Sequence, residues 1–256
     1  MAYFERLGPD TYRPTEHVSG AWDITTQHIG PALGLLVHQI QQDLAARRDD
    51  PMVISRLGYE LLGVVPMDVV DTTVEVIRPG RTIELVEATY GHGERTGIRV
   101  RAWLQQPRET GRIAGVGLEG IPRPEEMPEW DPTTLWDGGY LASAQVRRTE
   151  IATGHSEYWV RTDVPLLGDE PVSDLARAAA LFDIANGMAV RADPTRVHFP
   201  NIDLTAHLVR EPRGPWVGFE TRVTFGPGGL GLTSSVIHDL DGPVGTVAQS
   251  LTVRPG

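Results

Sequence analysis

A short pattern that occurs twice is the feature that most restricts how this chain can fold. Residues 69–79 read VVDTTVEVIRP, and residues 201–212 read NIDLTAHLVREP. Asp71 in the first stretch matches Asp203 in the second, and the Thr two positions later and the Arg seven positions later match as well. Both stretches alternate apolar with polar side chains, as half-buried strands do. We therefore interpret them as equivalent strands of a duplicated domain.

The order of the predicted helices also repeats. In the first half, apolar residues recur at steps of three and four over residues 33–44, which predicts an amphipathic helix. Pro31 suits the first turn of that helix, because the N–H that proline lacks would be unpaired there. In the second half, residues 173–187 predict a shorter helix, with Gly187 placed to end it.

Strand-like runs surround both helices. They cover residues 11–18, 67–79, 81–93 and 97–106 in the first half, and 143–151, 156–167, 201–209, 216–225 and 232–253 in the second. The Asp241-Gly242 pair inside the last run predicts a hairpin turn, so we expect two strands there. Each half therefore indicates a strand, a helix and an antiparallel meander, which together form an α+β organisation.

The composition changes between the two halves. Residues 117–139 hold four Pro, several Gly and a cluster of acids, which indicates a connection and not a regular element. We expect an N-terminal repeat over residues 1–110, a linker over residues 111–138 and a C-terminal repeat over residues 139–256.

Bulk composition excludes several partners. Of the 256 residues, 40% are hydrophobic and 22% are charged, which is typical of globular proteins. The N-terminus lacks the apolar core of a signal peptide, and no apolar window is long enough to span a bilayer. We therefore expect a cytoplasmic, soluble protein without membrane insertion. The net charge is −11 and no basic cluster exceeds an Arg pair, so nucleic acid is not an expected partner.

Missing residue types narrow the chemistry further. The chain has no Cys, which excludes disulfides, thiolate metal sites and a cysteine nucleophile. All 23 basic residues other than His are Arg, so Schiff-base chemistry and the phosphate-loop lysine are excluded too. The eight His show no metal-binding spacing, and we expect no metal. No G-x-S-x-G nucleophile elbow occurs.

One glycine-rich motif has a structural interpretation. Residues 226–231 read GPGGLG and match the dinucleotide pattern G-x-G-x-x-G. That pattern needs a helix after it, whereas the next residues predict a strand. We therefore interpret the motif as a hairpin turn.

Four polar residues are candidates for a site. His28 lies just before the predicted first helix, where free N–H groups could hold an anion or polarise a carbonyl, or where His28 only caps the helix. Asp183 lies on a helix of Ala and Leu. Taken alone it fits an exposed face slightly better than a buried site with a raised pKa. Asn201 opens a strand, and Gln249 lies in an apolar one, where a buried amide needs partners.

The sequence resembles the acyl-CoA thioesterase II family, whose fold is the double hotdog. Nearly the whole chain resembles it, most specifically WDITTQHIGPAL in the first half and FDIANG, NIDLTAHLVREP and DGPVGTVAQSLTVRP in the second. The resemblance implies two tandem repeats, each with a long helix wrapped by an antiparallel sheet. Mapped residue by residue, the family's Asp falls on Asp183 and its Gln on Gln249. Its Ser or Thr position falls on Asn201, which is a departure.

The resemblance also implies a mechanism. Asp183, Asn201 and Gln249 would activate a water that attacks the carbonyl of an acyl-CoA thioester, with Asp183 as general base. His28 and Gly30 would contribute to substrate binding, with backbone N–H groups near Gly30 stabilising the oxyanion. No cofactor is implied, because coenzyme A is part of the substrate. One chain already forms the pair of repeats, and further assembly into a homo-oligomer stays open.

Two alternatives stay open at this point. Because Asn201 replaces a hydroxyl residue, the chain could bind acyl-CoA or a lipid without turning it over. A hydratase or dehydratase on the same fold is the other alternative, although no motif of that chemistry is visible. In either case we expect the site in the second repeat, because the first copy of the opening pattern has the apolar Val69 where the second has Asn201.

Overall fold

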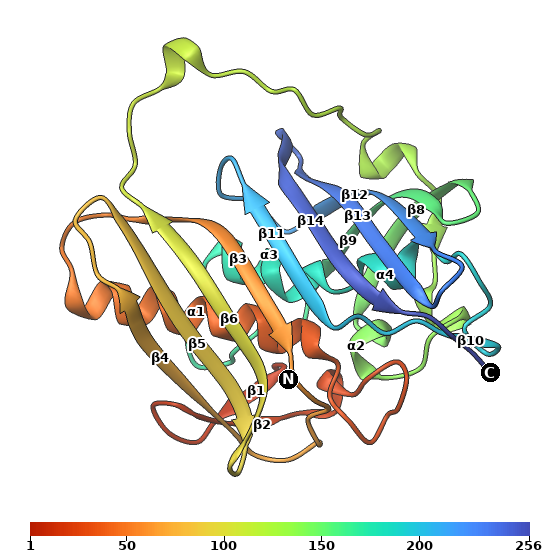
Figure 1. Cartoon of the computed structure of the whole chain (residues 1–256), viewed down its shortest axis with the longest axis horizontal. Coiled ribbons are helices and arrows are strands. Elements are labelled where there is room, and N and C mark those ends of the chain that lie inside the picture. Colours follow the sequence, from red (N-terminus) through yellow and green to blue (C-terminus); the bar gives the residue numbers. More distant parts are fainter.

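The computed structural model describes the whole chain, residues 1–256, and its two halves lie side by side along one sheet (Figure 1). The first half contains β1 (Phe4–Arg6), β2 (Thr11–Pro14), the 3₁₀ turn η1 (Glu16–Val18), α1 (Ile29–Arg47), β3 (Val53–Leu61), β4 (Val70–Arg78), β5 (Ile83–His92) and β6 (Arg95–Gln105). The second half contains α2 (Gly139–Ala142), β8 (Ala144–Ala152), β9 (His155–Thr162), α3 (Asp174–Phe182), α4 (Ala185–Met188), β10 (Val197–His198), β11 (Asp203–Leu208), β12 (Val217–Phe225), β13 (Leu230–Asp239), β14 (Gly242–Thr252) and β15 (Arg254–Pro255).

The connection between the halves holds only short elements. These are η2 (Gly111–Ile113), η3 (Pro124–Glu126), β7 (Glu129–Trp130) and η4 (Pro132–Thr134). Its first part arches away from the body, and its later part returns to the second half (Figure 1). There the indole N–H of Trp159 donates to the Pro122 carbonyl at 2.7 Å, and Trp136 is almost fully buried. The connection therefore contributes to the core of the second half.

The main sheet joins the two halves through their central strands. Its thirteen strands follow the order β1-β2-β4-β5-β6-β3-β11-β14-β13-β12-β9-β8-β7. β3 and β11 are the first main-sheet strands after the helices of their halves, and they pair antiparallel at the centre. α1 and α3 pack on the same side of this sheet (Figure 1). The buried apolar residues of both halves therefore form one cluster between helices and sheet.

A constant difference in residue number relates the halves, and we call it the repeat offset. It is the difference between Ala88 and Ser235, and it takes the cross-strand pair Ala88–Val100 to the cross-strand pair Ser235–Val247. The same offset takes the β3–β6 pairs to the β11–β14 pairs, and the β4–β5 pairs to the β12–β13 pairs. The predicted duplication is confirmed by this shared register.

The pattern around Asp71 and Asp203, however, does not mark equivalent strands. Asp71 lies on β4, whereas Asp203 begins β11, and the counterpart of β11 is β3. The alignment that the sequence indicated is therefore wrong, because half-buried strands share one alternating pattern wherever they lie in a sheet. At the repeat offset Asn201 corresponds to Ile54 and not to Val69. Ile54 pairs with Leu104, and Asn201 bridges Leu251, the counterpart of Leu104.

The central strand β3 was not predicted from the sequence. This strand carries a register shift between Ile54 and Arg56, and Gly58 follows in its middle. Both features interrupt the simple alternation on which strand prediction depends. The two predicted hairpins are confirmed, since residues 226–229 connect β12 with β13 and the turn before Gly242 connects β13 with β14.

The two helices differ in length and in burial. α1 has 19 residues, and the run from Gly30 to Ile40 is buried on every side, so it is a central core helix more than an amphipathic one. α3 has only nine residues and ends at Phe182. A break at Asp183 and Ile184 separates it from the short α4.

Small residues let the two helices approach closely. A Cβ added to Gly34 would lie 2.5 Å from the Ala176 carbonyl oxygen and 2.7 Å from the Ala180 Cβ. A Cβ at Gly30 would lie 2.8 Å from the Ala180 carbonyl oxygen. Gly30 thus meets the end of α3 and Gly34 meets its middle, so the helices run antiparallel. The first turn of α1 therefore lies beside the last turn of α3.

No helix in the chain combines the length and the apolar character that crossing a membrane would require.

The helix contact predicts the effect of a single methyl group. We expect Gly34→Ala to lower the free energy of unfolding by about 1–3 kcal/mol, because the methyl group would overlap backbone and side-chain atoms of α3. The better helix propensity of Ala offsets only about 1 kcal/mol of this cost. Urea unfolding measures the change. Gly115→Ala is the control, since nothing lies within 4 Å of its Cβ position. Equal stability of the two variants would contradict the close contact.

Candidate active site

Asp183 lies at the point where the second-half helix breaks. It is the C-cap residue of α3, and only 5% of its surface is exposed. The expectation that Asp183 lies on a wet face was wrong. The start of α1 covers the face of α3 that carries Asp183. The Ala and Leu pattern within one helix cannot indicate which other helix will cover it.

One oxygen of Asp183 is held by two side-chain amides. Asn201 Nδ2 donates to Asp183 Oδ1 at 2.8 Å, and Gln249 Nε2 donates to the same oxygen at 3.0 Å. Asn201 Nδ2 also lies 3.2 Å from the carbonyl oxygen of Asp203, which fixes its orientation. Gln249 is almost fully buried, and its Oε1 has no partner in the protein. The three residues that the resemblance selected therefore lie together, and one buried acceptor among them is unpaired.

His28 faces the other oxygen of Asp183. Its Nδ1 lies 3.7 Å from Asp183 Oδ2, which is longer than a hydrogen bond. The same Nδ1 accepts the N–H of Gly30 at 3.1 Å and so caps α1. The ring stacks on Tyr140 with centroids 4.0 Å apart, and the Tyr140 hydroxyl donates to the Ala180 carbonyl. His28 therefore combines the capping role with a position beside Asp183.

The charges of the pair follow from burial. Burial lowers the pKa of His28 to about 3, so the ring is neutral. Because Nδ1 accepts from Gly30, the neutral ring carries its proton on Nε2. Burial raises the pKa of Asp183 to about 7, although the hydrogen bonds from Asn201 and Gln249 act in the opposite direction. The contact between His28 and Asp183 is therefore no ion pair, and Asp183 titrates near neutral pH.

The first turn of α1 begins with an N–H group that has no partner in the protein. Gly30 N–H is taken up by His28, and Pro31 has none. Ile29, the first residue of the helix, donates to no protein atom. The donor of this turn that can serve a ligand is thus Ile29, next to the predicted Gly30.

A cleft gives access to these groups. It has a volume of about 410 Å³, and Asp183, Asn201, His28 and Ile29 line it together with Arg254. Asp183 also borders a much smaller, mainly hydrophobic pocket of about 20 Å³, whose walls include Trp22, Trp136, Leu141, Ile184 and Met188. Asp183 borders both spaces, the wider one beside polar groups of both halves and the smaller one beside mainly hydrophobic walls.

Trp136 forms a fixed wall of the apolar pocket. Its indole N–H donates to the Gly187 carbonyl at 2.9 Å, and the ring of Trp22 meets it edge-on with centroids 4.9 Å apart. Sequence reasoning missed Trp136 and Tyr140. Both come from the stretch WDGGY, which spans the boundary between the predicted linker and the predicted C-terminal repeat, and the Gly and Pro content before it indicated only a connection.

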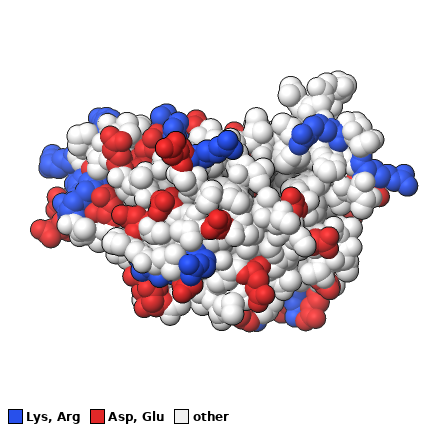
Figure 2. Space-filling view, turned by 90° about the horizontal axis from the view of Figure 1, so that it is seen from below, with Lys and Arg blue, Asp and Glu red and all other residues white.

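The site offers no evident place for a metal. No group of three or more His, Asp or Glu side chains is arranged to hold an ion. On the face shown in Figure 2, Arg side chains are scattered among acids and form no continuous basic stripe.

Two family models match this chain. The family model of the acyl-CoA thioesterase N-terminal domain matches residues 18–105, and that of the C-terminal domain matches residues 119–253. These two matches cover most of the chain. The protein therefore belongs to the acyl-CoA thioesterase family. No curated protein sequence matches the chain significantly.

Solved structures share the fold over the whole length. Acyl-CoA thioesterase II TesB2 from Mycobacterium marinum has a TM-score of 0.70 at 17% identity, covering 99% of this chain and 96% of its own. A conserved protein with a hot dog fold from Alicyclobacillus acidocaldarius has a TM-score of 0.76 at 14% identity, covering 98% and 95%. The dehydratase domain of PpsC from Mycobacterium tuberculosis has a TM-score of 0.54 at 15% identity, covering 99% and 98%. The predicted double hotdog is confirmed.

The burial of Asp183 predicts a pH-dependent stability effect. Its pKa is 3.8 in an unfolded chain and about 7 in the folded one, so between these values the unfolded chain ionises while the folded protein keeps the proton. The folded state therefore loses stability as the pH rises through this range. We expect Asp183→Asn to stabilise the protein by an amount that grows from about pH 4 to about pH 7 and then levels off at about 2–4 kcal/mol.

Urea unfolding at a series of pH values measures this gain. The control is Asp71→Asn, which changes an exposed carboxylate of the first half. A gain that does not depend on pH would show that the carboxyl of Asp183 titrates as in water.

Proposed function

We propose that this protein hydrolyses acyl-CoA thioesters with Asp183 as general base. The observation that carries this proposal is the Asp183 carboxylate itself. One oxygen is fixed by two amides, the other faces the cleft beside His28, and burial places the pKa at about 7. A base of that pKa is half ionised at neutral pH and can still accept a proton readily.

The unpaired acceptor of Gln249 completes the binding of a water. A water beside Asp183 would donate one hydrogen to Asp183 Oδ2 and the other to Gln249 Oε1, which has no protein partner. Asn201 does not need to touch this water. Its amide holds Asp183 in place, which a Ser or Thr hydroxyl could also do, so the departure from the family residue is compatible with catalysis.

The reaction then proceeds without a covalent intermediate. The water oxygen attacks the thioester carbonyl carbon while its proton moves to Asp183. The negative charge that forms on the carbonyl oxygen is stabilised by the Ile29 N–H at the positive end of α1. When the C–S bond breaks, Asp183 returns the proton to the leaving sulfur. The products are a carboxylic acid and a free thiol, and no cofactor takes part.

In this proposal the two spaces beside Asp183 hold different parts of the substrate. The wider cleft, with Arg254 among its lining residues, accommodates the coenzyme A side of the thioester. The apolar pocket behind Asp183 takes the acyl group. Its space of about 20 Å³ is on the scale of a single water or methyl group, so the proposed substrates carry short acyl chains.

Dehydration of a hydroxyacyl thioester is a second candidate, because His28 and Asp183 lie together. The pair comes from different halves, and the fold is shared with a dehydratase domain. Hydrolysis remains the better-supported proposal. Both amides converge on Asp183 as a water-activating group would need, and the family to which the chain belongs is that of the thioesterases.

Replacing the base predicts a loss of turnover. We expect Asp183→Asn to lower kcat about 10²–10⁴-fold and Gln249→Ala to lower it about 10–10³-fold, while Asp71→Asn keeps full activity. Thiol release from short-chain acyl-CoA measures these rates. If the wild type binds acyl-CoA without releasing a thiol, the result would instead support the alternative that the chain binds acyl-CoA without turning it over.

The titration of Asp183 predicts the pH profile of the wild type. Because the base must be ionised, kcat/KM should rise with pH and level off above the pKa of about 7. A profile that is already flat between pH 5 and pH 8 would contradict Asp183 as the base.

The acyl pocket predicts a shift in chain-length preference. We expect Trp136→Ala to raise kcat/KM for longer acyl chains relative to acetyl-CoA about tenfold or more, since a removed indole leaves room for several methylene groups. The control is Trp130→Ala, which removes an indole of the same connection that packs on Arg148 outside the pocket. A ratio that stays unchanged would show that the acyl group lies elsewhere.

A direct assay separates the two reactions. Hydrolysis releases a free thiol, whereas dehydration of a 3-hydroxyacyl-CoA leaves the thioester intact and creates a conjugated double bond that absorbs ultraviolet light. Formation of the enoyl thioester without thiol release would replace hydrolysis by dehydration as the function.

A further inference from the structure

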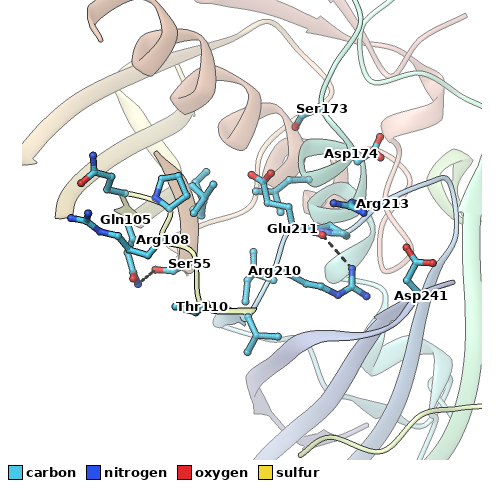
Figure 3. Close-up of a pocket in the computed structure, with 18 residues that line it drawn as sticks. Ser55, Gln105, Arg108, Thr110, Ser173, Asp174, Arg210, Glu211, Arg213 and Asp241 are labelled. Carbon is cyan, nitrogen blue, oxygen red and sulfur yellow. Dashed lines mark hydrogen bonds between the residues drawn. The ribbon is translucent and has the colours of Figure 1, made fainter. Parts of the chain in front are cut away.

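The pseudo-twofold relation of the halves gives the candidate site a counterpart. The repeat offset takes Leu61, Gly63 and Val64 at the rim of the candidate site to Leu208, Arg210 and Glu211. It also takes Val53 and Ile54 to Pro200 and Asn201. All of these residues line one of two clefts, and the second cleft, of about 910 Å³, is the larger (Figure 3). The duplication has therefore preserved a cleft at both places.

The helix ends of the two clefts correspond as well. Ser173 caps α3 by accepting the Ala176 N–H, as His28 caps α1 by accepting the Gly30 N–H. His28 lines the candidate site, and Ser173 lines the second cleft. The second cleft is thus built from the same pieces of backbone.

The second cleft lacks the catalytic side chains. At the repeat offset, Ile54 takes the place of Asn201, and Ala102 takes the place of Gln249. α1 carries no carboxylate before Asp43, so the first half has no carboxylate that corresponds to Asp183. The second cleft therefore has no counterpart of the base and the two amides that the proposed water activation uses.

The second cleft has more Arg among its lining residues than the candidate site has. Arg108 lies on one wall near Gln105 and Ser55, and Arg210 and Arg213 lie on the opposite wall (Figure 3). Arg210 is held by the buried Asp239 and keeps a fixed place. The side chains of Arg108 and Arg213 have no carboxylate partner and are free to bind an anion. The candidate site has Arg254 alone among its lining residues.

The acids of the second cleft are partly engaged. Asp174 binds Arg177 and accepts the N–H of Gly214. Partial burial and the charge of Asp174 raise the pKa of Glu211, so this carboxyl takes up a proton more readily than usual. Asp241 lies at the exposed rim. Arg108 and Arg213 therefore come from opposite walls of a cleft in which Asp174 is engaged by other groups (Figure 3).

We propose that the second cleft binds the phosphate-bearing part of coenzyme A between Arg108 and Arg213 without turning it over. The choice of ligand rests on the proposed function, because a cleft copied from an acyl-CoA site keeps a shape suited to the same molecule. The arginines add what the phosphates require, since guanidinium groups match phosphate oxygens in pairs. Each chain then has one catalytic and one non-catalytic place for coenzyme A.

Equilibrium titration with free coenzyme A tests this inference. We expect two binding events per wild-type chain, and one in a variant that combines Arg108→Ala with Arg213→Ala. The remaining event should keep its affinity, and thiol release should continue at the wild-type rate at low substrate concentration. Arg112→Ala is the matched control, because Arg112 is an exposed Arg of the same connection that does not line the cleft.

Partial ligands separate the source of the affinity. We expect ADP to compete for the event that the double variant loses, with an affinity at least about tenfold lower for the double variant than for the wild type. Pantetheine, which has no phosphate, should not compete for it. Thr110→Trp, which fills the cleft with an uncharged side chain, should abolish the same event and so confirms the place independently of the arginine charges.

Three results would overturn the inference. These are a single binding event in the wild type, two events that persist in the double variant, and an equal loss in the Arg112→Ala control. If acyl-CoA is not hydrolysed but the arginine-dependent event is present, the proposed function fails and the phosphate site stands. If hydrolysis is present without that event, the proposed function stands and this inference fails.

Discussion

The close contact between α1 and α3 is the constraint on which the rest of the structure depends. Gly30 and Gly34 leave no side chain between the helices, so Ala176 and Ala180 can lie against the backbone of α1. Because the helices run antiparallel, the positive end of one meets the broken end of the other. The carboxylate of the second half thereby lies beside N–H groups and an imidazole of the first. Neither repeat alone contains the candidate site, and any change that separates the helices would separate its two parts.

The two repeats share a backbone but not the polarity of their inner faces. At the repeat offset, Thr233 and Gln249 of the second half replace Val86 and Ala102 of the first. All four side chains are buried, and both Thr233 Oγ1 and Gln249 Oε1 are without a protein partner. Buried acceptors of this kind cost stability unless something donates to them. At these two positions the first repeat keeps an apolar interior, and the second has accepted a less stable one beside the proposed chemistry.

The sequence could predict the parts of this arrangement that depend on local pattern. Period-two strands, the helix at residues 33–44 and the hairpins at Gly226 and Gly242 follow from neighbouring residues, and the duplicated order of elements followed from them. The resemblance selected Asp183, Asn201 and Gln249, which the structure brings together around one oxygen. Three features depend on packing and could not be read in this way: the bulged central strand β3, the equivalence of β11 with β3, and the burial of Asp183 under α1. Trp136 belongs with them, because its place beside Asp183 is set by how the connection returns to the body.

Three carboxylates are buried in this protein, and their partners separate structure from reactivity. Glu84 binds Arg47 and Arg48, and Asp239 binds Arg210, with the result that the guanidinium groups outweigh burial and hold both pKa values below the usual range. Asp183 receives only neutral amides, which orient the carboxylate without supplying a positive charge. Burial therefore prevails, and the pKa rises to about 7. An Arg in place of either amide would make Asp183 a stable structural ion pair and a poor base at neutral pH. The choice of amides over guanidinium, in a chain that has 23 Arg and no Lys, is what keeps this one carboxylate able to exchange a proton.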